Sequence, residues 1–223
     1  MGARRRKHLA PLFKVFLVTM TSTIQAAVIQ IDELEAKFQL NETSDINFFR
    51  EWQDDLPELT LWEKQSLDRL KTGYLDVIKK PPVLENYVRM AMLYPLLFIA
   101  GFYLSPLQVK SEQPISLETE EGTIIEGRLD ILILKNQFWF LVIESKRPSI
   151  AVESGIAQIL AYMLANPQPH LPTFGMITNG GYFMFVKLLQ IENSQYALSD
   201  TFVIRNQGNE LYQVLRILKK LVH

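Results

Sequence analysis

Short apolar runs bounded by turn residues dominate the second half of the chain. Residues 131–134 and 138–143 are rich in β-branched and aromatic side chains, and the polar pair Lys135-Asn136 follows the first run. Runs of this length and composition are typical of strands rather than helices. The pattern therefore predicts a β-hairpin in which the start of the first strand lies beside the end of the second.

Further strands are predicted on both sides of this hairpin. Residues 115–119 and 123–134 flank a turn at 120–122, which makes a second hairpin. Downstream, two more apolar runs predict strands at 174–178 and 182–188. The sequence thus predicts three antiparallel strands followed, after an interval, by two more.

Apolar residues spaced by three and four predict helices around these strands. Thr60 and Glu63 match a capping box at the start of one of them. In another, Pro95 should cause a kink and Gly101 should end the helix. The predicted helices are 21–49, 61–77, 83–100, 153–165 and 211–222.

This order of elements predicts an α/β fold with a mixed β-sheet flanked by helices. The helix at 153–165 separates the third predicted strand from the fourth, and strands joined through a crossover helix pair in parallel. We expect two parts of the chain: a basic arm with a helical extension over residues 1–80, and a core with a C-terminal helix over residues 81–223.

Two carboxylates and one lysine are expected to meet at one end of the central hairpin. Asp130 lies near the start of the first strand of this hairpin, and Glu144 and Lys146 lie at the end of the second on the same face, because side chains alternate along a strand. Buried charges cost several kcal/mol unless they pair or bind a metal. Carboxylate and carbonyl oxygens are ligands that Mg²⁺ prefers, so the set suits metal-assisted phosphodiester hydrolysis. The alternative is an ordinary ion pair at a strand end.

These residues carry a resemblance to a known family. Asp130 followed at a distance by Glu144-x-Lys146 resembles the PD-(D/E)xK nuclease superfamily, although a leucine stands where that family has its leading proline. Gln158 and Tyr162 resemble the Gln-x-x-x-Tyr motif of the RecB-like branch. Together with residues 144–148 and 178–180, the chain looks most like the amino-terminal nuclease domain of type I restriction enzyme motor subunits, over residues 82–188.

The resemblance implies a restriction-endonuclease-like core (αβββαβ) and a cytoplasmic DNA endonuclease that depends on Mg²⁺, with Mn²⁺ as a substitute. It implies metal ligation by Asp130, Glu144 and the carbonyl of Ser145. Lys146 would position or activate the attacking water, and Gln158 would assist it.

Two further residues have two readings each. Glu85 matches a helix glutamate that faces the metal site in the resembling nucleases, but it also lies one turn from Arg89 and can form a solvent-facing pair with it. Tyr162 shares a helix face with Gln158 and can stack or hydrogen bond in the site. It can equally be a buried tyrosine whose hydroxyl is satisfied.

Composition excludes several other classes of site. The chain has no cysteine, which excludes disulfides, thiol catalysis and cysteine-ligated zinc. The three histidines, His8, His170 and His223, show no ligand spacing, which disfavours a histidine-based nuclease. The net charge is −1, so any affinity for nucleic acid must come from a local basic face.

The expected partners are DNA and other protein chains. No Gly-x-x-x-x-Gly-Lys-Ser/Thr loop occurs, so a motor or specificity subunit would be a separate chain. A homodimer stays open, and no membrane partner is expected. The alternatives are a non-catalytic or partner-dependent nucleic-acid-binding subunit of a restriction or repair assembly, and a junction resolvase, homing endonuclease or RNA-cleaving toxin with the same core.

The amino terminus has three readings. A basic run at residues 4–7 precedes an apolar stretch, as in a signal peptide, but Pro11 and Lys14 interrupt that stretch. Met20 can be the true start, or the basic run can be an arm that touches phosphates. Export is disfavoured because an exported nuclease of this type would lose its substrate.

Overall fold

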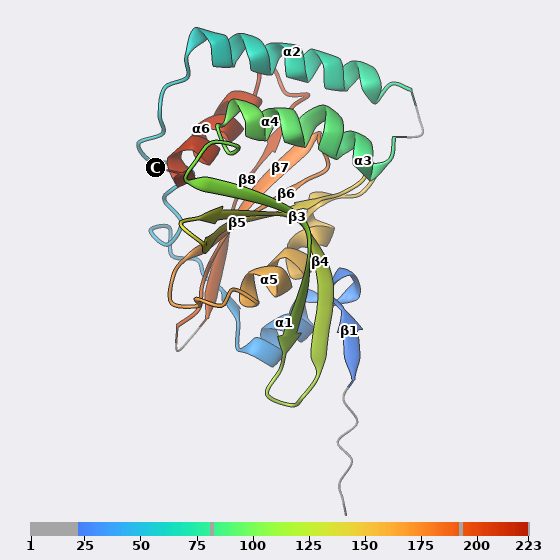
Figure 1. Cartoon of the computed structure of the whole chain (residues 1–223), viewed down its shortest axis with the longest axis vertical. Coiled ribbons are helices and arrows are strands. Elements are labelled where there is room, and N and C mark those ends of the chain that lie inside the picture. Colours follow the sequence, from blue (N-terminus) through green and yellow to red (C-terminus); the bar gives the residue numbers. More distant parts are fainter. Residues whose placement is uncertain (1–21, 81–82, 192–193, 223) are drawn as a thin grey trace, which may run out of the picture.

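The computed structural model describes residues 22–80, 83–191 and 194–222. Its described residues form one mixed sheet of eight strands with helices on both faces (Figure 1). This confirms the predicted α/β fold and is compatible with a restriction-endonuclease-like core. The strands are β1 (Thr23–Gln25), β2 (Asn41–Glu42), β3 (Leu107–Glu118), β4 (Ile124–Lys135), β5 (Phe138–Ser145), β6 (Thr173–Thr178), β7 (Tyr182–Leu189) and β8 (Gln195–Val203).

The helices lie in two layers. Figure 1 shows α2, α3, α4 and α6 on one side of the sheet and α1 and α5 on the other. The helices are α1 (Ile31–Phe38), α2 (Leu61–Val77), α3 (Glu85–Val88), the π-helical turn η2 (Arg89–Leu93), α4 (Tyr94–Ile99), α5 (Ile156–Leu164) and α6 (Leu211–Val222), with short 3-10 turns η1 (Ala26–Val28) and η3 (Val152–Gly155).

The strand order is β1-β4-β5-β6-β7-β8-β2, and β3 pairs with β4 outside this path. β5 pairs in parallel with β6, as the crossover helix α5 predicts. β3, β4 and β5 form the three antiparallel strands expected from the sequence, and β6 and β7 the later pair.

β4 divides one of its edges between two partners. β3 pairs with it along its whole length. Because a strand has two edges, β1 and β5 must share the other one. β1 pairs with residues 124–126 and β5 with residues 131–135. The intervening backbone at 127–130 therefore has no strand partner on that edge, and Asp130 lies at the end of this gap.

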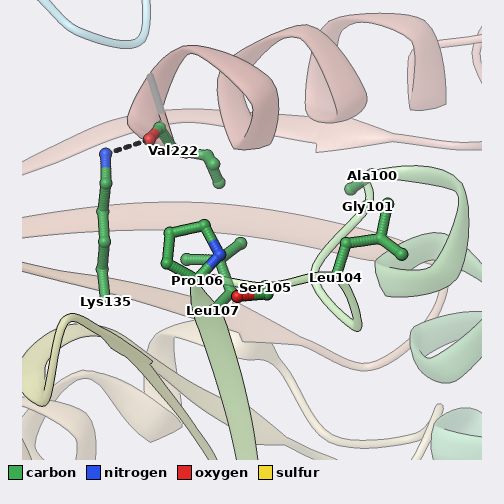
Figure 2. A pocket seen from close by; sticks show the side chains of 8 residues that line it. All are labelled: Ala100, Gly101, Leu104, Ser105, Pro106, Leu107, Lys135 and Val222. Atoms are coloured by element: carbon green, nitrogen blue, oxygen red, sulfur yellow. Dashed lines mark hydrogen bonds between the residues drawn. The ribbon is translucent and has the colours of Figure 1, made fainter.

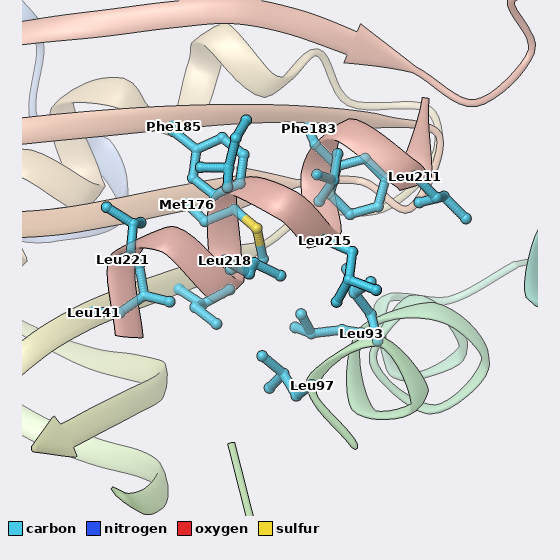
Figure 3. Packing of buried hydrophobic residues seen from close by; sticks show 14 of the residues in the cluster. Leu93, Leu97, Leu141, Met176, Phe183, Phe185, Leu211, Leu215, Leu218 and Leu221 are labelled. Carbon is cyan, nitrogen blue, oxygen red and sulfur yellow. The ribbon is translucent and has the colours of Figure 1, made fainter. Parts of the chain in front are cut away.

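A separate hydrophobic core fills each side of the sheet. On one side, Leu93 and Leu97 of the η2–α4 segment approach Leu215 and Leu218 of α6 above the sheet residue Met176 (Figure 3). On the other side, α5 is buried along its whole length against the opposite face. Each fully buried leucine stabilises the fold by about 1.5–3 kcal/mol, so both helix layers are firmly attached.

The predicted helix at 83–100 is divided into α3, η2 and α4. Pro95 lies in the first turn of α4, where its missing N–H and its ring conflict with a regular preceding turn. The chain accommodates it with the wider π-turn, in which the amide of Tyr94 donates to the carbonyl of Arg89. The helix ends before Gly101, whose φ of 82° is in the left-handed region, as predicted.

The prediction of one helix over residues 21–49 is wrong. Among the described residues of this range, α1 is the only α-helix and η1 is a short 3-10 turn, and Gln39 adopts a left-handed conformation that ends α1. The flanking residues instead form the short edge strands β1 and β2. Two other strands also differ: β3 begins at Leu107 rather than at residue 115, and β8 was not predicted at all. Both contain many polar side chains, which obscure the apolar alternation.

The boundary between two parts at residue 80 stays a prediction. β1 and β2, both N-terminal to it, nevertheless pair with β4 and β8. The basic run at 4–7, Met20 and the prolines at 81–82 lie outside the described residues. In the described part of the chain, every helix is too short or too polar to cross a membrane.

A tight turn after β6 joins α2 to the loop that carries Lys146. The hydroxyl of Tyr74 in α2 donates to the carbonyl of Asn179 at 2.8 Å, and the Asn179 side-chain amide donates to the carbonyl of Ile150 at 2.8 Å. The amide of Lys146 donates to the carbonyl of Thr178 at 2.7 Å. The turn thus holds the loop after β5 from two sides.

Gly180 and Gly208 offer a matched test of this turn, because their φ angles are 80° and 87°. A Cβ at Gly180 would lie 2.1 Å from the buried Tyr74 hydroxyl, whereas one at Gly208 would meet nothing within 4 Å. Gly208→Ala should lower the free energy of unfolding by about 1 kcal/mol from backbone strain, and Gly180→Ala by about 1–3 kcal/mol more from overpacking. Urea unfolding of both variants measures this, and equal losses would contradict it.

Candidate active site

The central hairpin brings the two predicted carboxylates together. Ile131 of β4 pairs with Ile143 of β5, and Asp130 and Glu144 are the next two residues of this register, just beyond the paired part of the ladder. One Asp130 oxygen, Oδ2, accepts hydrogen bonds from the Ser145 amide at 2.7 Å and the Ser145 hydroxyl at 2.5 Å. At this point of the gap, the Asp130 side chain therefore replaces the backbone hydrogen bonds that would otherwise join β4 to β5.

A chain of polar contacts runs from Glu144 to the opposite side of the gap. The Lys146 ammonium lies 3.0 Å from Glu144 Oε1 and donates to Gln158 Oε1. The Gln158 amide nitrogen donates to the Tyr162 hydroxyl at 2.7 Å, and that hydroxyl donates to the Arg128 carbonyl at 3.1 Å. The four predicted residues Glu144, Lys146, Gln158 and Tyr162 are thus connected.

Tyr162 is buried against the unpaired segment of β4. A Cβ at Gly127 would lie 2.5 Å from the Tyr162 ring, so this close approach requires glycine. Burial, which outweighs the hydrogen bond from Gln158, raises the pKa of Tyr162 to about 12. The hydroxyl is therefore protonated at neutral pH and is satisfied both as acceptor and as donor.

Glu144 is the most strongly perturbed acid of this cluster. Its side chain is 6% exposed, and one oxygen, Oε2, is buried without a hydrogen-bond partner. Burial, and then the negative charge of Asp130, raise the pKa of Glu144 to about 8, against the opposing effect of Lys146. Its carboxyl group therefore lacks a positive neighbour strong enough to compensate its charge.

Glu85 faces the site and also pairs with Arg89. The Arg89 guanidinium lies 2.7 Å from Glu85 Oε1, as the i,i+4 spacing predicts. It also lies 3.3 Å from Asp130 Oδ1 and 3.8 Å from Glu112 Oε1. The negative charge of Glu85 contributes to the raised pKa of Glu144. The predicted ion pair with Arg89 is therefore present, and Glu85 is also a neighbour of the carboxylate site.

The sequence did not predict the other members of this ion-pair cluster. The helical spacing indicates Arg89 only as the partner of Glu85, and the strand pattern gives no role to Glu112. Glu112 approaches because β3 starts well before the predicted strand and pairs with β4 beside Asp130. Its φ of 51° marks an irregularity in β3 at this point. A polar stretch in a strand was the only available signal.

Side chains supply only some of the oxygen ligands that a divalent cation would need here. No three His, Cys, Asp or Glu side chains within the described ranges form a group that could hold a metal ion. Asp130 and Glu144 supply two carboxylates, and the unpartnered Glu144 oxygen provides a donor without competition. Mg²⁺ commonly takes one or two carboxylates and fills its remaining positions with other oxygens, so the residues present fit such an ion.

A pocket elsewhere in the molecule is unrelated to this chemistry. It has a volume of about 410 Å³ and lies between the end of α4, the start of β3 and the end of α6 (Figure 2). Among the described residues that line it, Lys135, which donates to the carbonyl of Val222, is the charged one. Lys135 is the last residue of β4, whereas Asp130 lies within that strand, and none of the described residues that line the pocket has a carboxylate side chain.

Comparison with known families supports a nuclease-like domain. Residues 109–194 match the family model described as the type I restriction enzyme R protein N terminus. This span is less than half of the chain, and it supports a type I restriction enzyme nuclease-like domain here. Asp130, Glu144, Lys146, Gln158 and Tyr162 lie inside it, whereas the Glu85–Arg89 pair precedes it. No curated protein matches the chain.

The raised pKa of Glu144 predicts how stability depends on pH in the metal-free protein. Between pH 4.5, the ordinary pKa, and about pH 8, the unfolded chain releases a proton that the folded protein retains. The free energy of unfolding should therefore fall as pH rises through this window and level off above it. Glu144→Gln removes this contribution, so it should match the wild type at pH 5 and exceed it above pH 8 by on the order of 2–4 kcal/mol.

Urea unfolding of both proteins in the presence of a chelator, at several pH values, measures this difference. Asp76→Asn is a suitable control, because Asp76 is exposed and its pKa is lowered by its bond to Lys79. A gap between wild type and Glu144→Gln that stays constant with pH would contradict the burial of an ionisable Glu144.

Proposed function

We propose that this chain is a divalent-metal-dependent DNA endonuclease of the PD-(D/E)xK type. One observation carries the proposal: the buried Glu144 has an unpartnered oxygen beside Asp130 and Lys146. A carboxylate with so little compensation is unfavourable in a purely structural ion pair, whereas a bound cation would stabilise it. The match over residues 109–194 gives independent support for a nuclease-like domain.

Asp130, Glu144 and the carbonyl of Ser145 would hold Mg²⁺, or Mn²⁺ in its place. When bound, the ion supplies Lewis-acid stabilisation of charge on the phosphate and favours ionisation of the attacking water. The Ser145 amide and hydroxyl fix the Asp130 carboxylate through Oδ2 and leave Oδ1 for other partners. Glu85 is a further candidate ligand, but its oxygen Oε1 is held by Arg89.

Lys146 is the residue that acts on water and on the phosphate. Its ammonium, between Glu144 and Gln158, can orient the attacking water, stabilise the hydroxide that forms from it, or offset the charge that develops on the phosphate. Gln158 fixes the ammonium through its side-chain oxygen. Since that oxygen is already occupied, we propose that Gln158 assists by orienting Lys146 as well as any water nearby.

Tyr162 acts mainly on Gln158. Its hydroxyl accepts from the Gln158 amide and donates to a backbone carbonyl in the gap of β4. This fixes which end of the Gln158 amide faces Lys146. We therefore propose that Tyr162, although part of the motif, positions the site rather than touching the substrate.

The proposed substrate is DNA, and the proposed partners are a separate motor or specificity subunit. The matched family is described as the N terminus of the R protein of a type I restriction enzyme, which favours function within a larger assembly. A second candidate function follows from the same match: a nucleic-acid-binding subunit that cleaves only in the presence of its partners. A junction resolvase or homing endonuclease would use the same residues on a different substrate.

Metal and carboxylate substitution test the proposal together. The purified chain should cleave duplex DNA with Mg²⁺ or Mn²⁺ but not with Ca²⁺, which prefers longer bonds and a larger, looser shell. Asp130→Asn and Glu144→Gln should each abolish cleavage, and in the presence of a chelator they should spare or raise DNA affinity because each removes a carboxyl group that can repel phosphate. Gel-based cleavage and binding assays on the same duplex measure both effects.

The substrate panel should include single-stranded DNA, a four-way junction and RNA, which separates the endonuclease from the alternatives. Cleavage without a metal, or normal turnover by Asp130→Asn, would rule out the proposed site. Absence of cleavage by the isolated chain, with activity restored by partner subunits, would favour the partner-dependent candidate.

Lys146 and Gln158 should differ in the size of their effects. Lys146→Ala should lower the cleavage rate roughly 10²–10⁴-fold, the usual size of a proton-transfer or charge-stabilising contribution. Gln158→Ala should lower it less, because a neutral amide that orients Lys146 carries no charge to the transition state. Single-turnover rates with saturating enzyme give the comparison, and a larger loss for Gln158→Ala would mean that the two roles are reversed.

A further inference from the structure

Arg89 lies among three carboxylates at the edge of the site. Its guanidinium is 2.7 Å from Glu85, 3.3 Å from Asp130 and 3.8 Å from Glu112, and its side chain is only 15% exposed. None of the roles described above uses this residue. Its position beside Asp130 Oδ1 nevertheless means that any cation bound by Asp130 must share that carboxylate with a positive charge.

The contacts of Arg89 are incomplete. Its pairing with Glu85 is a hydrogen bond, but its pairing with Asp130 is an ion pair that is not accompanied by a hydrogen bond. Its Nε is buried and has no hydrogen-bond partner. Guanidinium has five N–H donors in a planar fork that suits two acceptor oxygens at once. Asp130 and Glu85 therefore hold Arg89 without satisfying it.

The backbone at Arg89 is also irregular. Arg89 is the first residue of the π-turn η2, whose wider winding is imposed by Pro95. Glu85 is the first residue of α3, and Arg89 follows the last residue of α3 as the first residue of the turn that departs from α-helical geometry. Such turns frequently occur at functional sites, and here the turn sets the position of a charged side chain over Asp130.

We propose that Arg89 is an exchangeable counter-ion that couples metal binding to nucleic-acid binding. In the metal-free protein its guanidinium neutralises Asp130 and Glu85. A divalent cation at Asp130 repels the guanidinium and displaces it, and the displaced guanidinium binds a non-bridging oxygen of a phosphodiester. This inference rests on the proposed function, because it assumes that Asp130 holds a metal and that the substrate carries phosphodiesters.

The chemistry favours a phosphodiester as the second partner of Arg89. Planar bidentate pairing with phosphate oxygens is a preferred mode of arginine, and it would give the unpartnered Nε an acceptor. Displacement also frees Glu85, which can then turn toward the metal. Metal and nucleic acid should therefore each raise the affinity for the other, as linkage requires.

The test uses Ca²⁺, which supports binding without the proposed cleavage. Isothermal titration calorimetry measures Ca²⁺ affinity of the free chain, and fluorescence anisotropy measures affinity for a short labelled duplex in Ca²⁺ and in chelator. Arg89→Gln and Arg89→Ala should bind Ca²⁺ about tenfold or more tightly than the wild type, because a repelling charge is gone. Their duplex affinity in Ca²⁺ should fall about tenfold or more, and the gain from Ca²⁺ should shrink.

Arg128→Ala is the matched control. Arg128 also pairs with Glu112, at 3.5 Å, but its side chain is 68% exposed and makes no ion pair with Asp130. Its substitution should leave Ca²⁺ affinity within about twofold and should lower duplex affinity by the same factor with and without Ca²⁺. Circular dichroism and thermal unfolding establish that each variant is folded. Glutamine is the conservative replacement, because it can still donate to Glu85.

The outcomes separate this inference from the proposed function. The control result is that the wild type binds Ca²⁺ and Asp130→Asn does not. If, given that result, both Arg89 variants bind Ca²⁺ with the affinity of the wild type, the counter-ion role is overturned. Tighter Ca²⁺ binding with unchanged duplex affinity would overturn the phosphate role. A wild-type chain that binds no Ca²⁺ would overturn both proposals. If the Arg89 variants show the predicted changes in Ca²⁺ and duplex affinity but the wild-type chain cleaves no nucleic acid, the result supports this inference and overturns the proposed endonuclease activity.

Discussion

Incomplete neutralisation of buried charge is the constraint on which this site depends. Glu144 lies near the end of β5, a strand that is apolar from Phe138 to Ile143, and Lys146 compensates only one of the Glu144 oxygens. Moving a carboxylate out of water costs several kcal/mol, which a single ion pair recovers only with good geometry and further hydrogen bonds. The rest of the fold must supply that stability, and the two buried cores on either side of the sheet do so.

The division of the β4 edge between β1 and β5 turns this constraint into a site. An unpaired strand edge exposes N–H and C=O groups that must find other partners. Here the Tyr162 hydroxyl donates a hydrogen bond to the Arg128 carbonyl, and the Asp130 carboxylate accepts one from the Ser145 amide. The same gap allows α5 to approach closely enough for Gln158 to reach Lys146. A continuous ladder at residues 127–130 would leave no room for these side chains.

The sequence predicted the central part of the fold because local rules and tertiary structure agree there. Strand alternation placed Glu144 and Lys146 on one face, and the hairpin brought Asp130 beside them. The helical spacing of Gln158 and Tyr162 correctly put both on the side of α5 that faces the gap. Turn residues with left-handed φ angles, such as Gly101, marked the ends of elements in advance.

Elements that depend on distant partners could not be predicted in this way. β1 and β2 are only three and two residues long, and each exists because β4 or β8 offers it an edge. The contact of Arg89 with Asp130 joins residues 41 positions apart, and no local spacing encodes it.

The same limitation applies to the cluster of ion pairs around Arg89, which only the three-dimensional structure reveals. A motif search identifies the residues that the chemistry requires, whereas the residues that regulate their charge come from other elements. Arg89 belongs to a helical segment that precedes the span matched by the family model. Glu112 belongs to the first part of β3, where polar side chains obscure the strand pattern. Substitution at these positions can change the charge around Asp130 without altering the motif. The electrostatics of the site therefore depends on side chains from β3, β4 and the α3–η2 segment and not on the motif alone.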